Sequence, residues 1–135
     1  MNGVNINGTY VYRSLLNDQN VQTNFDDLEF GSGTMNITQT GKTVKGTFDM
    51  GSGYEMTLEG TVYSDDTHSY LSMTGYGIPD TVTDKWVYDY FGIIVPIWPN
   101  AVAQVPTITG SVIRGVDHGA SKAGVTATFY IVLKA

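Results

Sequence analysis

The sequence predicts an all-β protein, and more specifically an eight-stranded antiparallel up-and-down barrel. Threonine, valine and tyrosine, which favour strands, are frequent in the 135-residue chain, 16 glycines punctuate it, and helical periodicity is nearly absent. Short glycine turns join successive segments, so sequential strands should pair as antiparallel neighbours. Eight such strands without a helix close most naturally into a barrel, which removes both sheet edges. A β-sandwich is the alternative.

Eight segments have the composition or the alternation of strands. They are residues 7–15, 33–40, 43–49, 54–63, 69–76, 85–93, 106–116 and 123–133. The turns between them include Thr40-Gly41-Lys42 and Gly51-Ser52-Gly53, with further turns at 65–68 and 117–120. We expect a single barrel domain over residues 1–135.

Apolar and polar side chains alternate in the third, fourth and last segments, as in a sheet with one dry and one wet face. The positions expected inside are Val44, Gly46 and Phe48; Tyr54, Met56, Leu58, Gly60 and Val62; and Val125, Ala127, Phe129, Ile131 and Leu133. Glycines within strands, at positions 46, 60, 75 and 110, suit the tight coiling of a small barrel. Such a barrel is either filled by side chains or holds one small ligand.

Composition excludes several classes of partner and site. Seven Lys and Arg against 13 Asp and Glu give a net charge of -6, which argues against nucleic acid and membrane surfaces as partners. The chain has no cysteine, so disulfides and thiolate metal sites are excluded. No apolar run reaches the length of a spanning helix. We expect a cytoplasmic protein, with secretion left open if a signal peptide preceded Met1.

The sequence holds no motif for serine-hydrolase, phosphate-loop or dinucleotide chemistry. His68 and His118 lie in acidic turns, where histidines are usually solvated, so neither a metal site nor another cofactor is expected.

Several short motifs resemble the avidin-type barrels. Asn7-Gly8-Thr9-Tyr10 is similar to their Gly-Thr-aromatic opening, and residues 33–48 are similar to their second and third strands. Residues 54–63 are similar to the fourth strand, and residues 126–133 to the closing strand. The similarity extends over roughly half of the chain. It implies an avidin- or lipocalin-like barrel of the calycin type.

The biotin site of that family is not retained. In avidins a third-strand tyrosine donates a hydrogen bond to biotin, whereas the matching position here is Phe48, which has no donor. Tyr12 stands where the family usually has the smaller asparagine, and the first connection, roughly 16–32, is longer. A missing buried hydrogen bond weakens such a site heavily, so biotin is not the expected ligand.

Residues 85–100 contain both tryptophans of the chain. Trp86, Tyr88 and Tyr90 alternate with Val87, Asp89 and Phe91, so both faces of this strand carry rings. Either its outer face packs in an oligomer interface, or its rings form one wall of a ligand cavity. The sequence does not decide which face points inward. The candidate ligand-binding residues are Tyr12, Phe48, Met56, Trp86, Tyr88, Tyr90, Trp98, Arg114 and Phe129.

Asp89 and Arg114 are the charges set within otherwise apolar strand patterns. If both point inward they should pair, because an unpaired buried charge is unfavourable. Such a pair would be structural, or it would anchor a carboxylate or carbonyl of a ligand. In an enzyme these two residues are the catalytic candidates, with Asp89 as a general base.

The stretch 93–105 is apolar and contains Pro96 and Pro99, which cannot donate to a sheet. Two interpretations fit an apolar loop: a lid across one barrel mouth with Trp98 pointing down, or a contact between subunits.

Together these observations predict a protein that binds a small, largely apolar or aromatic molecule in a central barrel cavity. The alternative is a small barrel enzyme, of cyclase or isomerase type, that shapes its substrate in the cavity. A scaffold protein whose rings serve only assembly is a third hypothesis. We expect a homo-oligomer, a dimer or tetramer, formed through residues 85–133.

Overall fold

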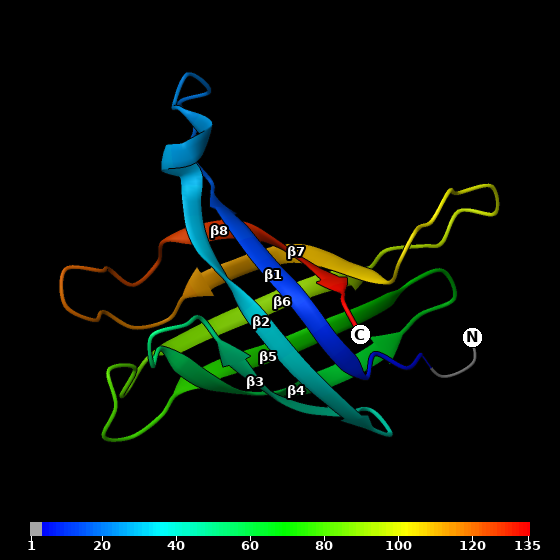
Figure 1. The fold of residues 1–135 in the computed structure, drawn as a ribbon, viewed down its shortest axis with the longest axis horizontal. Helices are drawn as coiled ribbons and strands as arrows, with labels where there is room; N and C mark the ends of the chain where they lie inside the picture. The colour runs from blue at the N-terminus through cyan, green and yellow to red at the C-terminus, as the bar shows by residue number, and fades with distance from the viewer. Residues whose placement is uncertain (1–3) are drawn as a thin grey trace.

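The computed structural model describes residues 4–135 and shows a closed barrel of eight antiparallel strands in chain order (Figure 1). The strands are β1 (Gly8–Leu16), β2 (Glu29–Thr40), β3 (Thr43–Asp49), β4 (Glu55–Ser64), β5 (Ser69–Gly77), β6 (Val87–Ile94), β7 (Thr107–Arg114) and β8 (Thr126–Leu133). Pairing of β1 with both β2 and β8 closes the barrel. The up-and-down barrel is therefore confirmed over the sandwich.

The β1–β2 hairpin projects beyond the barrel wall (Figure 1). Its tip contains the short 3-10 helix η1 (Phe25–Leu28), whose first turn is capped by the side chain of Asn24. Within residues 4–135 no helix is long and apolar enough to cross a membrane.

Side chains fill the barrel interior. The alternation predicted for the third, fourth and last strands is confirmed, with Phe48, Met56 and Phe129 buried almost completely. The Tyr12 ring lies 4.6 Å from that of Phe48 and 6.0 Å from that of Phe129, and Tyr90 packs edge-on against Phe129. The cavity left inside measures about 40 Å³, little more than a water molecule. Of the two interiors that the sequence allows, the filled one is observed, and the central cavity expected to hold a ligand is too small for one because aromatic rings occupy that space.

Glycines allow adjacent strands to approach closely as the sheet coils. A Cβ at Gly46 would overlap the carbonyl oxygen of Asn36, and a Cβ at Gly110 would overlap that of Phe91. Both glycines face a neighbouring backbone rather than a flexible side chain. Their place within strands is explained by this close packing.

Asp89 and Arg114 do not both point inward, so the condition under which they were expected to pair is not met. Tyr88 and Tyr90 point into the barrel, so Asp89 between them points out, where it accepts a hydrogen bond of 2.7 Å from Thr74 Oγ1. On the neighbouring strand Arg114 pairs in register with Tyr88 and shares its inner face. Because side chains alternate along a strand, Asp89 and Arg114 lie on opposite faces of the sheet.

The lid predicted around Trp98 is wrong. The loop between β6 and β7 extends away from the barrel (Figure 1), and Trp98 is 69 % exposed. Its conformation is held by Gln104, which accepts from the Trp98 backbone N–H at 3.0 Å and donates to the Pro96 carbonyl at 2.9 Å. The interpretation of this loop as a subunit contact stays a prediction.

The outer face of β6–β8 carries the side chains on which the predicted assembly depends. Phe91, Ile113 and Tyr130 are 49 %, 39 % and 45 % exposed. We expect a dimer or tetramer by light scattering, and we expect Phe91→Ser to shift the protein toward smaller species. Val102→Ser, in the β6–β7 loop, tests the alternative contact. A monomer at every practical concentration would contradict both interfaces.

Candidate functional site

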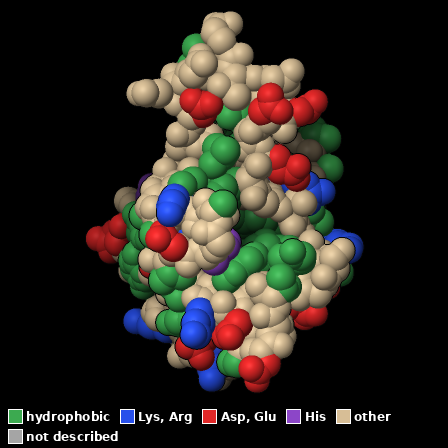
Figure 2. Space-filling view, turned by 90° about the vertical axis from the view of Figure 1, so that its left-hand side faces the viewer, with side chains coloured by type: hydrophobic (Ala, Val, Ile, Leu, Met, Phe, Trp, Pro, Cys, Tyr) green, Lys and Arg blue, Asp and Glu red, His purple; other side chains and the backbone are tan. Residues whose placement is uncertain are grey.

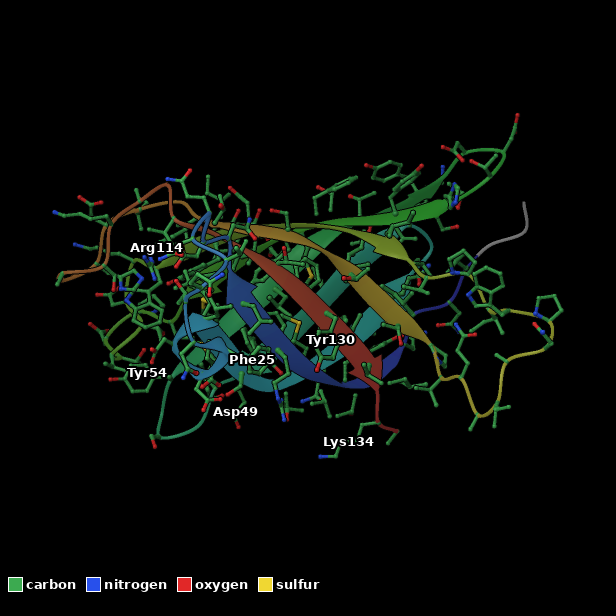
Figure 3. All side chains as sticks on the ribbon, turned by 90° about the horizontal axis from the view of Figure 1, so that it is seen from above. Phe25, Asp49, Tyr54, Arg114, Tyr130 and Lys134 are labelled. Carbon is green, nitrogen blue, oxygen red and sulfur yellow. The ribbon has the colours of Figure 1, made fainter. Side chains whose placement is uncertain are left out.

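The main candidate site is an open cavity of about 430 Å³ at the end of the barrel where β6 begins and β7 ends. We call it the mouth site. It is lined by Glu29, Phe30, Gly31, Ser32, Met50, Tyr54, Trp86, Tyr88, Arg114, His118 and Ser121. Figure 2 faces this end and shows hydrophobic side chains gathered below the projecting hairpin, and Figure 3 places Tyr54 and Arg114 at this same end.

Trp86 and Tyr88 form one wall of the mouth site. Tyr88 lies on the inner face of β6, and Trp86 precedes that strand in a connection fixed to the barrel. The Trp86 carbonyl accepts a hydrogen bond of 2.8 Å from the Gly77 N–H, and the Trp86 N–H donates one of 2.9 Å to the Thr83 carbonyl. The Thr83 hydroxyl is buried and donates to the Glu55 carbonyl at 2.6 Å. The indole is therefore held in place by a rigid connection.

A β-bulge brings Phe30 into the mouth site. Ser14 pairs with Gly31 and Leu15 with Glu29, so Phe30 has no partner on β1 and the register shifts. Bulges commonly redirect a side chain near a functional site. The Phe30 ring lies 6.1 Å from that of Tyr88, in an edge-on contact.

His118 is positioned by a tight turn between β7 and β8. Its backbone exchanges hydrogen bonds of 2.9 and 3.0 Å with Ser121, and Gly119 supplies the positive φ of +57° that this turn requires. The imidazole stacks on Trp86 with ring centroids 4.0 Å apart. Its Nε2 lies 2.8 Å from Tyr88 Oη.

The His118 ring is neutral at neutral pH. Burial lowers its pKa from the usual 6.5, and the nearby positive charge of Arg114 lowers this pKa further. In the tautomer that carries its proton on Nδ1, Nε2 accepts from the Tyr88 hydroxyl, whose oxygen accepts from Arg114.

Arg114 supplies positive charge to the mouth site. Its Nε donates to Tyr88 Oη at 3.0 Å and its Nη1 to the Lys122 carbonyl at 3.1 Å. The guanidinium carbon lies 5.0 Å from the Phe30 ring centroid and 5.8 Å from that of Tyr88. Among residues 4–135 the guanidinium forms no ion pair. The charge is thus oriented by neutral groups and aromatic faces.

The small inner cavity lies directly beneath the mouth site and shares Phe30, Gly31, Met50 and Tyr88 with it. Tyr12 and Tyr90 line its deeper part and hydrogen-bond to each other. Burial raises the pKa of both phenols well above the usual 10.0, so both stay protonated. The base of the site is therefore uncharged.

Two outer grooves have similar volumes. One, of about 510 Å³, runs between residues 16–19 and 124–126, and the other, of about 440 Å³, lies between Arg13, Phe25 and Tyr130. Both follow the base of the projecting hairpin. Neither combines several rings with a histidine and an arginine as the mouth site does.

The structure separates the sequence-predicted site residues into groups. Trp86, Tyr88 and Arg114 line the mouth site, and Tyr12, Phe48, Met56 and Tyr90 line the inner cavity. Phe129 belongs to the packed core, Asp89 faces outward, and Trp98 lies in an exposed loop. The roles of these residues in binding or catalysis stay predictions.

Sequence reasoning missed Phe30 and His118 as site residues. His118 was expected in a solvated turn, and the sequence carries no signal for its stacking on Trp86. Phe30 was assigned to the long first connection, before the start of the expected strand. Tyr54 was expected inside the barrel, and it lies at the mouth, 40 % exposed.

No protein family, curated protein or solved structure matches the chain. The closed antiparallel barrel is consistent with a calycin-like fold and compatible with ligand binding.

Proposed function

We propose that the protein binds a small, flat, largely aromatic molecule at the mouth of the barrel. The observation that carries this proposal is an open cavity of about 430 Å³ in which rings from several segments surround the hydrogen-bonded groups of Tyr88, His118 and Arg114. Aromatic rings beside converging polar groups are typical of small-molecule sites of this volume, and the exposed lining of this cavity is more polar than apolar. The ligand binds at the barrel entrance, because packed rings leave only about 40 Å³ below it.

The expected result of Trp86→Ala is an affinity for N-phenyl-1-naphthylamine, a neutral aromatic dye, that is weaker by about tenfold to a hundredfold. This range corresponds to the loss of about 1.5–3 kcal/mol from burial of a large ring. Fluorescence titration measures the affinity, and circular dichroism checks the fold. The matched control is Trp98→Ala, which changes the other tryptophan, exposed in the β6–β7 loop. The reverse pattern would place the dye at that loop and contradict the proposal.

A second candidate function is proton-transfer catalysis, as in an isomerase or cyclase. The observation that favours it is the hydrogen-bonded chain of Arg114 Nε, Tyr88 Oη and His118 Nε2, with successive distances of 3.0 and 2.8 Å. Tyr88 would take a proton from a bound ligand while passing its own to His118, and the return of this proton at another carbon would complete an isomerisation. These residues replace Asp89 as the candidate acid–base group.

The probe for this second function is 5-nitrobenzisoxazole. A base removes its C3 proton, the N–O bond breaks, and a coloured cyanophenolate forms without a co-reactant. We expect Tyr88→Phe and His118→Gln to abolish this activity, and Tyr76→Phe, an exposed tyrosine on β5, to preserve it. Because the His118 pKa is below 6.5, the activity should persist above pH 6.5 and fall as the pH drops through that pKa. Equal rates in all variants would exclude the relay.

We infer an avidin-like architecture for the barrel from its hairpin motifs, without a biotin site. Phe48 offers no hydrogen-bond donor, and its ring packs 4.6 Å from that of Tyr12 in the region that a buried ligand would need. Both features support a ligand other than biotin.

A further inference from the structure

We propose that the ligand of the mouth site is a monoanion, namely a planar aromatic or conjugated carboxylate whose acid group binds Arg114. This inference rests on the proposed binding function and specifies its ligand. It starts from the charges of the lining residues, which are Glu29 and Arg114. Glu29 is exposed at the start of β2, whereas Arg114 is half-buried and is the last residue of β7. His118 is neutral, so the positive charge facing the cavity belongs to Arg114.

The guanidinium retains N–H donors beyond the two hydrogen bonds that it makes to the protein. Arginine has five N–H groups, and here Tyr88 Oη accepts from Nε and the Lys122 carbonyl accepts from Nη1. One N–H on Nη1 and both on Nη2 remain, and they can form two parallel bonds to a carboxylate. The two bonds already made fix the guanidinium, so little side-chain freedom is lost when an anion binds.

The surroundings of Arg114 strengthen its attraction for an anion. Phe30 and Tyr88 place rings 5.0 and 5.8 Å from the guanidinium carbon, which reduces the access of water. In this environment an ion pair is less screened than on an open surface. A carboxylate would neutralise a charge that the described protein residues leave without an ion pair.

The aromatic part of such an acid has a place beside the same arginine. His118 joins the arginine to the indole wall, because it hydrogen-bonds to Tyr88 and stacks on Trp86 with ring centroids 4.0 Å apart. A flat molecule can therefore contact the rings while its acid group reaches Arg114. Its length is limited by the cavity of about 430 Å³.

A singly charged acid fits better than a phosphate. Phosphate sites generally combine several cations or backbone N–H groups, whereas the lining supplies one arginine and also contains Glu29. The net charge of -6 further disfavours a dianion. A single arginine guanidinium beside several aromatic rings therefore points to a carboxylate.

The test compares 1-naphthoate, 1-naphthamide and 1-naphthyl phosphate as competitors of N-phenyl-1-naphthylamine. The first two have nearly the same shape and differ in charge. We expect 1-naphthoate to bind about tenfold to a hundredfold more tightly than the amide, as for hydrogen bonds to a charged group. The phosphate should bind more weakly than 1-naphthoate.

Arg114→Gln should remove the preference for 1-naphthoate, measured within that variant as the ratio of the affinities for 1-naphthoate and 1-naphthamide. Arg114→Lys, which keeps the charge and loses the fork, should retain part of the preference. Arg13→Gln, an exposed arginine on β1, is the matched control and should keep all of it. Thermal unfolding checks that each variant is folded.

The outcomes separate this inference from the proposed function. Equal binding of acid and amide, or a preference unaffected by Arg114→Gln, overturns the anion proposal while dye binding at Trp86 still stands. Tighter binding of the phosphate overturns the carboxylate class. Failure of Trp86→Ala to weaken dye binding overturns the proposed function itself.

Discussion

Gly110→Ala is expected to lower the free energy of unfolding by at least about 4 kcal/mol, a large fraction of the stability of a domain of this size. The added Cβ would overlap the carbonyl oxygen of Phe91 and lie 2.6 Å from the Gly92 Cα. Both atoms belong to the backbone of β6, so the strands must separate to admit a methyl group. Separation would weaken the β6–β7 hydrogen bonds around the Gly92–Gly110 pair. Urea denaturation measures the change.

Gly75→Ala is the matched control, since Gly75 also lies within a strand on the inner face. Its added Cβ would meet side chains, with the Met56 methyl at 3.2 Å and the Tyr90 ring at 3.4 Å. A flexible methionine can move by a few tenths of an ångström. We expect a change within about 1 kcal/mol. Equal losses in the two variants would show that close backbone approach is not what requires glycine at position 110.

The architecture could be predicted because it depends on local patterns. Turns such as Thr40-Gly41-Lys42 determine which strands pair, and alternation determines which side chains face inward. The first and last of the eight strands then meet because closure satisfies both edges. These features require no knowledge of distant contacts.

The filling of the interior could not be predicted in this way. The same alternation fits a hollow barrel and a packed one, since the outcome depends on how far each ring reaches across the barrel. Tyr12 contacts Phe48, Tyr90 and Phe129, which come from three other strands. The sequence gives the size of each ring, but it does not show that these rings meet in the centre of the barrel.

The mouth site depends even more on tertiary structure. Phe30 reaches it through a bulge that interrupts the alternation, and the Tyr88–His118 contact joins residues 30 positions apart. Conversely, Asp89 was a candidate because it lies among aromatic neighbours in the sequence. Its position on the outer face separates it from Arg114, although the two strands are adjacent. Local composition therefore indicated a strand that reaches the mouth site, together with a residue, Asp89, that faces away from it.

Phe129→Ala is the second change with a large expected effect, because it tests whether the interior is a packed core. Phe129 is fully buried and contacts Tyr12 and Tyr90. Truncation of a buried phenylalanine removes apolar contacts and leaves a cavity, and we expect a loss of about 3–5 kcal/mol. Tyr130→Ala, at the next position but on the outer face and 45 % exposed, should cost about 1 kcal/mol or less. Urea denaturation of both variants measures the difference.

The vacated space should also bind a small aromatic molecule, because an apolar cavity of ring size in a packed core can hold benzene. Benzene should raise the melting temperature of the Phe129→Ala variant in a concentration-dependent way, and it should have little effect on the unmodified interior, where about 40 Å³ is free. A benzene effect of equal size in both proteins would mean that the barrel centre already admits a ligand. The mouth site would then be the entrance to a central site, and the packed rings of Tyr12, Phe48 and Phe129 would have to move apart when the ligand enters.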